Sequence, residues 1–294
     1  MGPTLPPHDD PPREPVARER DAPSVALSGD LEPVAVVTGG SRGIGRALAE
    51  RLARNTMRVV LVARDRDDLA SAAQSLTRSA VMPPVDWIAL DLARPDAPAT
   101  LLSGLASRGF WCHTLVHCAG VGHSGAFSEA AQCELDAVLD LNVTATTRLV
   151  RAMLPGLLRR RTGGVLTIAS LGGYVPGPGQ ATYYASKAYQ ISLMEALAAE
   201  NAATGVRFSV VVPGPVDTGF HADMGAEAAP YRRWGFASSP EAVARIALLG
   251  YKLGLRVIPT GPFGAAMIVA LRVLPHRLSV PIVKWLLSTP NVGG

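Results

Sequence analysis

Three side chains between residues 170 and 187 have the chemical types needed to move a proton onto or off an oxygen atom. Ser170 carries a hydroxyl, Tyr183 a phenol and Lys187 an ammonium group. Residues four positions apart lie on one face of a helix, so a helix through Tyr183 and Lys187 would aim both side chains at one pocket. With Ser170 at the same pocket, the three groups could exchange a proton with a substrate oxygen.

The flanking sequence predicts the elements that position these groups. Residues 164–169 (Gly-Val-Leu-Thr-Ile-Ala) are apolar and partly β-branched, which is typical of a buried strand. Residues 185–200 are rich in Ala, Leu, Met and Glu, which favours a helix. Ser170 is therefore expected at the end of a strand, and Tyr183 and Lys187 on the helix that follows.

The same alternation of strand and helix runs through most of the 294 residues. It predicts an α/β fold with a doubly wound, seven-stranded parallel sheet and helices on both faces. One domain is expected over residues 31–261, after a flexible Pro- and charge-rich tail over 1–30 and before an apolar, amphipathic extension over 262–294. The strands are expected at 34–38, 58–63, 85–90, 114–118, 164–169, 206–212 and 257–258, and the helices at 43–54, 66–79, 96–107, 129–159, 183–204 and 239–253.

Composition narrows the class of protein. Apolar residues make up 48% of the chain, which supports a sizeable core. The net charge of +4 comes from scattered basic residues, so no nucleic-acid partner is expected. Three cysteines without a CxxC spacing and six dispersed histidines predict no metal site. The first 30 residues lack the apolar core of a secretory signal, so a cytoplasmic location is expected.

A glycine-rich segment directly follows the first predicted strand. Residues 38–45 read Thr-Gly-Gly-Ser-Arg-Gly-Ile-Gly and lead into a predicted helix. Glycines there allow a tight turn and bring the backbone close to a pyrophosphate, which the N–H groups of the helix N-terminus can bind. The alternative is a tight turn without a ligand. The placement favours a dinucleotide cofactor bound by Thr38, Gly39, Ser41, Arg42, Gly43, Ile44 and Gly45.

Arg64 at the end of the second predicted strand bears on the choice of cofactor. An acidic residue there bonds the ribose 2′-hydroxyl of NAD, whereas an arginine accommodates the 2′-phosphate of NADP. Arg64, with Arg42 in the glycine-rich segment, favours NADP(H), with NAD(H) as the second choice. The alternative is that Arg64 pairs with Asp67 or Asp68 and that Asp65 binds the ribose.

Together these segments resemble the short-chain dehydrogenase/reductase (SDR) family, whose members have a Rossmann fold. The resemblance covers about residues 33 to 260, and its seven motifs occur in the family's order. A lone Tyr-x-x-x-Lys match is commonplace, whereas seven motifs in order are specific to the family. The motifs are Thr38-Gly-x-x-x-Gly-x-Gly45, Asp91-Leu92, His117-Cys-Ala-Gly120, Asn142, Ser170, Tyr183-x-x-x-Lys187 and Pro213-Gly214.

The resemblance implies roles for individual residues. Asp91 should bond the adenine amino group, Lys187 the ribose of the nicotinamide half, and Asn142 should hold a water that relays a proton. The remaining cofactor contacts fall on Leu92, Ala119, Gly120, Tyr183, Pro213, Gly214, Val216 and Thr218. His117 and Cys118 replace the family's two asparagines, which puts in doubt the amide brace that normally ties the central sheet together.

The resulting functional prediction is an oxidoreductase that interconverts a carbonyl and an alcohol on a hydrophobic substrate with NADP(H). Tyr183 is the general acid/base, because a nearby ammonium and an oxidised nicotinamide favour its phenolate. Ser170 donates a hydrogen bond to the substrate oxygen. The alternatives are an NAD-dependent alcohol dehydrogenase and a non-catalytic protein that senses the cofactor on the same fold.

The substrate side is expected in the loop over residues 214–237, facing residues 174–180. Tyr174, Gln180, Phe220 and Met224 are the predicted substrate contacts, although aromatic side chains there could equally pack a lid onto the domain. The extension could contact a membrane peripherally, meet a partner subunit or fold back on its own domain. A homodimer or homotetramer is expected from the resemblance.

Overall fold

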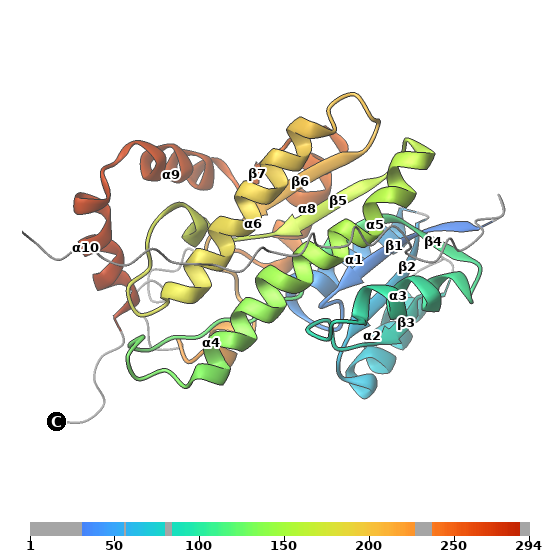
Figure 1. Ribbon diagram of the computed structural model, residues 1–294, viewed down its shortest axis with the longest axis horizontal. Helices are drawn as coiled ribbons and strands as arrows, with labels where there is room; N and C mark the ends of the chain where they lie inside the picture. The colour runs from blue at the N-terminus through green and yellow to red at the C-terminus, as the bar shows by residue number, and fades with distance from the viewer. Residues whose placement is uncertain (1–30, 56, 80–83, 227–236, 289–294) are drawn as a thin grey trace, which may run out of the picture.

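The computed structural model describes residues 31–55, 57–79, 84–226 and 237–288 (Figure 1). The tail expected over residues 1–30 lies outside the described residues. So do Tyr231, Trp234 and Phe236, which are aromatic residues of the loop expected to cover the substrate.

A seven-stranded parallel sheet forms the centre of the molecule, as predicted, in the order β3-β2-β1-β4-β5-β6-β7. The order reverses between β1 and β4, and doubly wound sheets bind ligands at the carboxyl ends of strands beside such a reversal. The strands are β1 (Glu32–Thr38), β2 (Arg58–Ala63), β3 (Asp86–Ala89), β4 (Phe110–His117), β5 (Gly164–Ile168), β6 (Arg207–Val212) and β7 (Val257–Pro259).

Helices cover both faces of the sheet, which explains why its strands are apolar throughout. Along β1, Val34 and Val36 pack against one layer of helices while Ala35 and Val37 pack against the other, and all four are fully buried. The first layer contains α3 (Ala97–Ala106), α5 (Thr146–Arg160) and α6 (Ala181–Glu200), and the second contains α1 (Gly43–Arg54), α2 (Arg66–Ser79) and α8 (Pro240–Lys252).

Several boundaries differ by a few residues from the predicted ones, and β4 and the helices before β5 are two examples. Strand β4 begins at Phe110 rather than Thr114, because Phe110 and Trp111 already pair with Glu32 and Pro33 of β1. The single helix expected over 129–159 consists of α4 (Gln132–Leu139), a π-helical turn η1 (Asp140–Ala145) and α5. The π-helical turn contains Asn142, and such turns are frequent at functional sites.

The remaining short elements and the extension lie beyond the carboxyl end of the sheet. They are the 3₁₀ turn η2 (Leu171–Tyr174), α7 (Phe220–Asp223), α9 (Pro262–Val273) and α10 (His276–Leu287). In Figure 1 the two red helices α9 and α10 stand past the arrowhead of β5, so the extension is placed at the end of the sheet where a ligand would bind.

Candidate active site

A large cavity opens at the carboxyl ends of the strands. Its volume is about 1590 Å³, which exceeds the roughly 300–1,000 Å³ of typical small-molecule pockets. Its lining comes from the glycine-rich loop, the ends of β2, β4, β5 and β6, and the helices α4, α6, α7, α9 and α10. The cavity is therefore large enough for a cofactor and a substrate together.

Most residues predicted from the sequence line this one cavity. They are Gly39, Ser41, Arg42, Gly43, Ile44, Arg64, Asp91, Leu92, Ala119, Gly120, Ser170, Gln180, Tyr183, Lys187, Pro213, Gly214, Val216, Thr218, Phe220 and Met224. Four predicted residues, Thr38, Gly45, Asn142 and Tyr174, are not part of the lining. Thr38, Gly45 and Asn142 each contact a residue of the lining instead. Tyr174 contacts α9.

The glycine-rich loop has the shape that a pyrophosphate requires. Gly39 has φ = +63°, and a Cβ atom at Gly45 would overlap the carbonyl oxygen of Gly39, so the turn depends on both glycines. No side chain caps the N-terminus of α1, whose first residue is Gly43. Because helix N-terminal N–H groups and the helix dipole favour anions, these residues fit the phosphates of a dinucleotide.

The two arginines expected at the 2′-phosphate have different surroundings. Arg64 is exposed beside the cavity, and Asp65 uses its carboxylate to accept hydrogen bonds from the main-chain N–H groups of Asp67 (2.9 Å) and Asp68 (2.8 Å). Asp65 therefore caps α2. Arg42 forms an ion pair with Asp223 of α7, which links the glycine-rich loop to the segment where substrate contacts are expected.

Ser170 lies two residues beyond β5 at the start of η2. Its Oγ accepts a hydrogen bond from the main-chain N–H of Gly172 (3.1 Å), which fixes the hydroxyl while its own proton stays available as a donor. Tyr183 lies in the first turn of α6, and its ring is half-buried at the cavity. Both residues thus reach the same space from different elements.

Lys187 lies one turn after Tyr183 and is buried, with 5% of its surface exposed. Its Nζ atom lies 5.7 Å from the centre of the Tyr183 ring. It donates hydrogen bonds to the main-chain oxygen of Ile168 (3.1 Å) and to Oε1 of Gln190 (3.0 Å). Burial lowers the pKa of Lys187 from 10.5 to about 8, against a smaller opposing effect of Cys118.

Asn142 is fully buried in η1 directly behind the cavity. Its side chain accepts a hydrogen bond from Val121 N–H (3.0 Å) and donates to Val121 O (2.8 Å) and to Ser186 Oγ (3.0 Å). Its main-chain oxygen accepts from Thr146 Oγ1 (2.6 Å) and from Gln190 Nε2 (2.9 Å). The water-holding role of Asn142 stays a prediction.

His117 supplies a brace at the position where the sequence put one in doubt. Its Nδ1 atom lies 3.2 Å from Thr38 Oγ1 on β1, and its Nε2 atom lies 2.7 Å from Thr146 Oγ1 on α5. Burial lowers the pKa of His117 to about 3, with a further contribution from Lys187, so the imidazole is neutral. An imidazole thus ties the centre of the sheet to α5 where an amide was expected.

The predicted substrate contacts separate into two groups. The Phe220 ring lies 5.5 Å from the Tyr183 ring, and the buried Nε2 of Gln180 has no hydrogen-bond partner within the described residues. Tyr174 instead accepts a hydrogen bond from Arg272 of α9 (3.4 Å), so it packs against the extension. Tyr184 packs against Gly177, where a Cβ atom would overlap its ring, and it also lines the cavity.

The extension forms a cavity wall that the sequence did not reveal. Its apolar pattern allowed membrane contact, partner contact or simple burial, and no motif linked it to the site. The structure places nine residues of α9 and α10, together with Leu274 between them, in the lining: Phe263, Met267, Ala270, Leu271, Leu274, Ser279, Ile282, Val283, Leu286 and Leu287.

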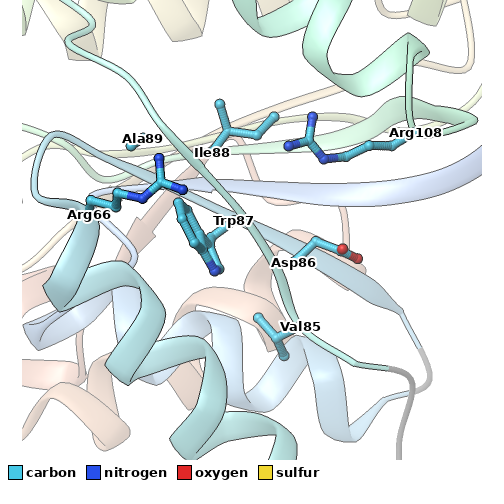
Figure 2. Close-up of a pocket in the computed structure, with 7 residues that line it drawn as sticks. All are labelled: Arg66, Val85, Asp86, Trp87, Ile88, Ala89 and Arg108. Carbon is cyan, nitrogen blue, oxygen red and sulfur yellow. The ribbon is translucent and has the colours of Figure 1, made fainter.

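A second hollow of about 500 Å³ lies at the free edge of β3 (Figure 2). Arg66 covers the Trp87 ring there at 5.0 Å, while Arg108 lies near Ile88. It shares no lining residue with the large cavity, so it is separate from the candidate active site.

The parts of the chain that the structure describes contain no group of three or more His, Cys, Asp or Glu side chains arranged to hold a metal ion. Within the same ranges, no helix combines the length and apolar character needed to cross a bilayer.

Known proteins share this fold. The family model for short chain dehydrogenases matches residues 33–229. An uncharacterized oxidoreductase of Staphylococcus saprophyticus is 34% identical over 194 residues, which is 65% of this chain and 82% of the relative. A short-chain dehydrogenase from Sphingobium yanoikuyae in complex with NADPH has a TM-score of 0.74 at 27% identity, covering 89% of this chain and 98% of that one.

A further structure, a short-chain dehydrogenase/reductase from Burkholderia phymatum in complex with NAD, has a TM-score of 0.73 at 25% identity. The match covers 90% of this chain and 100% of that chain. The fold and the site together define a nicotinamide-dependent oxidoreductase. This chain belongs to the short-chain dehydrogenase family.

Proposed function

We propose that this protein is an NADP(H)-dependent carbonyl reductase acting on hydrophobic substrates, with Tyr183 as the general acid/base. The observation that carries the proposal is the position of Lys187. This residue is buried, its Nζ atom lies 5.7 Å from the centre of the Tyr183 ring, and it lines a largely apolar cavity. A purely cofactor-sensing protein would not require this acid–base pair.

The cofactor would lie along the glycine-rich loop, Asp91 and Gly120, with Arg64 at the 2′-phosphate. When bound, a reduced nicotinamide supplies the hydride. NADP(H) is favoured over NAD(H) by the exposed Arg64 and by the use of the Asp65 carboxylate as a helix cap. The structure solved with NADPH and the one solved with NAD leave both cofactors within the family's range.

The protein's own residues handle the proton. Ser170 Oγ donates a hydrogen bond to the substrate oxygen as negative charge develops there. Tyr183 gives its phenolic proton to that oxygen during reduction and takes it back during oxidation. The Lys187 ammonium stabilises the phenolate that forms, because an opposite charge nearby favours the ionised phenol. The buried Nε2 atom of Gln180, which has no partner among the described residues, would orient a polar group of the substrate.

The extension would cover the substrate and limit its size and polarity. Apolar side chains from α9 and α10 line the same cavity as Phe220 and Met224, so the cavity would accept long or bulky apolar groups. We propose a homodimer or homotetramer in cytoplasmic solution, in keeping with the family resemblance.

Peripheral membrane contact is a second proposal for the extension. Val273, Leu278 and Trp285 are exposed by 77%, 52% and 55%, and Arg277 and Lys284 add positive charge on α10, which has no acidic residue. The expected result is co-sedimentation with vesicles rich in anionic lipid. Equal recovery with vesicles of neutral lipid, or no sedimentation, would count against it.

The proposed activity is tested by NADPH oxidation against a panel of aldehydes, ketones and 3-oxoacyl thioesters, with NADH in parallel. The proposal expects turnover of at least one apolar carbonyl compound and preference for NADPH. Turnover with NADH alone would contradict the NADP(H) assignment. The absence of turnover across the panel would contradict the proposed carbonyl reductase activity.

A further inference from the structure

Gln190 connects the buried lysine to the π-helical turn. It lies three residues after Lys187 on α6 and is fully buried. Its Oε1 accepts from Lys187 Nζ (3.0 Å), and its Nε2 donates to Asn142 O (2.9 Å) and to Thr146 Oγ1 (3.2 Å). An ammonium only donates and a carbonyl oxygen only accepts, so these partners fix the orientation of the amide.

The hydrogen bonds continue from Thr146 to the first strand with one consistent set of donors. Thr146 Oγ1 donates to Asn142 O (2.6 Å), so it must accept from His117 Nε2–H (2.7 Å). His117 Nδ1 then accepts from Thr38 Oγ1, whose oxygen in turn accepts from the main-chain N–H groups of Cys118 and Ala119. Each polar side-chain atom in this hydrogen-bond network, from Gln190 to Thr38, is paired.

The other end of the hydrogen-bond network is the Lys187 ammonium, which lies beside Tyr183. Among its contacts with described residues, Lys187 Nζ uses two of its three N–H groups for Ile168 O and Gln190 Oε1. One N–H group is left for the open side, where the Tyr183 ring and the cavity lie. The two fixed bonds therefore determine the direction of the third.

We propose that Gln190 is a positioning residue of the active site, which fixes Lys187 Nζ and links it through Thr146 and His117 to Thr38 beside the glycine-rich loop. The inference rests on the proposed function, because it assigns Gln190 to the same proton-transfer site. The main-chain oxygen of Asn142 accepts two hydrogen bonds, one from Thr146 and one from Gln190. The Gln190 amide therefore supplies the connection between this oxygen and Lys187.

The titratable groups near Lys187 are His117, Cys118 and Tyr183. Gln190 adds an uncharged acceptor to these surroundings. Replacing Gln190 by Met keeps the approximate shape but removes the acceptor Oε1. The ammonium then loses a hydrogen bond that favours its charged form, so the pKa of Lys187 falls.

The chain offers a direct measurement because it has only three lysines, Lys187, Lys252 and Lys284. In protein labelled with ¹³C at the lysine ε-carbons, Lys252→Arg and Lys284→Arg assign the two exposed residues. The pH at the midpoint of the Lys187 ¹³Cε titration is expected to fall by about one unit in Gln190→Met, a modest shift for a buried group. An unchanged midpoint would overturn the proposal.

Tyr189→Phe is the matched control. Tyr189 is the neighbour of Gln190 on α6, and its hydroxyl lies 2.6 Å from Thr147 Oγ1, so it joins the same two helices on their exposed side. This variant should leave the Lys187 midpoint unchanged. A shift as large as that of Gln190→Met would mean that any loosening of α5 against α6 moves Lys187, and would contradict the specific role of Gln190.

A second pair of variants tests the connection if Gln190→Met does not fold. Thr146→Val removes the hydroxyl and Thr146→Ser keeps it, so only the first should lower the Lys187 midpoint. Equal midpoints in the two would overturn the proposal. The titration needs neither cofactor nor substrate, so an inactive wild-type protein would refute the proposed function while the role of Gln190 is still decided.

Discussion

Arg42 of the glycine-rich loop forms an ion pair with Asp223 of α7. The pair joins a residue expected at the cofactor phosphate to the segment where substrate contacts are expected. Both side chains are substantially exposed, at 70% and 47%, so the pair contributes little to folding stability. A phosphate bound by Arg42, as we propose, would compete with Asp223 for the guanidinium.

Asp223→Asn should therefore strengthen NADPH binding. Exposed ion pairs are worth about 0–1 kcal/mol, so the dissociation constant is expected to fall by up to about five-fold. Binding of NADH, which lacks the 2′-phosphate, should not change. Titration of cofactor fluorescence measures both constants, and an equal change for the two cofactors would contradict the competition.

Arg64→Ala should weaken NADPH binding far more than NADH binding. A charge-assisted hydrogen bond contributes about 1.5–3 kcal/mol, which corresponds to a loss of about 10-fold to 100-fold in affinity. The comparison variant is Arg66→Ala on α2, since Arg66 stacks on Trp87 away from the large cavity. Equal losses for NADPH and NADH in Arg64→Ala would contradict the assignment of the 2′-phosphate.

His117 should make the protein less stable in mild acid. Its pKa is lowered from 6.5 to about 3, so between these values the unfolded chain binds a proton that the folded protein excludes. Stability therefore falls as pH falls through this window, by about 2 kcal/mol between pH 6.5 and pH 5. His117→Asn should lose this part of the pH dependence in urea unfolding at pH 7 and pH 5. The same dependence in both proteins would contradict a neutral buried His117.

A charge introduced into the wall formed by α9 should impair binding of apolar substrates. Leu271 lines the cavity, whereas Val269, two residues earlier, points outward with 63% of its surface exposed. Leu271→Asp should raise KM by at least about 10-fold because a carboxylate would be buried against the substrate. Val269→Asp should leave KM and kcat unchanged. Similar KM values in the two variants would contradict the proposed wall.

The sequence predicted the sheet well because its signals are local. Each strand is a short apolar run, and the glycine-rich loop follows β1 directly, so periodicity and turn chemistry identify both. The residues predicted around the cofactor, apart from Thr38 and Gly45, also line one cavity, because the carboxyl ends of parallel strands meet at one edge of the sheet.

The parts that the sequence did not predict depend on contacts between distant segments. His117 was expected to weaken a brace, yet it meets Thr38 and Thr146, which lie 79 and 29 residues away. The role of α9 and α10 in the cavity wall depends likewise on tertiary packing. Gln190 could have been noticed, since it lies on the Lys187 face of α6, but a buried amide has no sequence signature.

The most direct test of the proton-transfer assignment is the kcat/KM of Tyr183→Phe for an NADPH-dependent reduction. General acid–base catalysis contributes about 10²-fold to 10⁴-fold, so a loss of about 1,000-fold is predicted, with NADPH binding retained. Tyr189→Phe on the same helix should keep the wild-type value. Turnover by Tyr183→Phe at the wild-type rate would contradict the assignment of Tyr183 as the general acid/base.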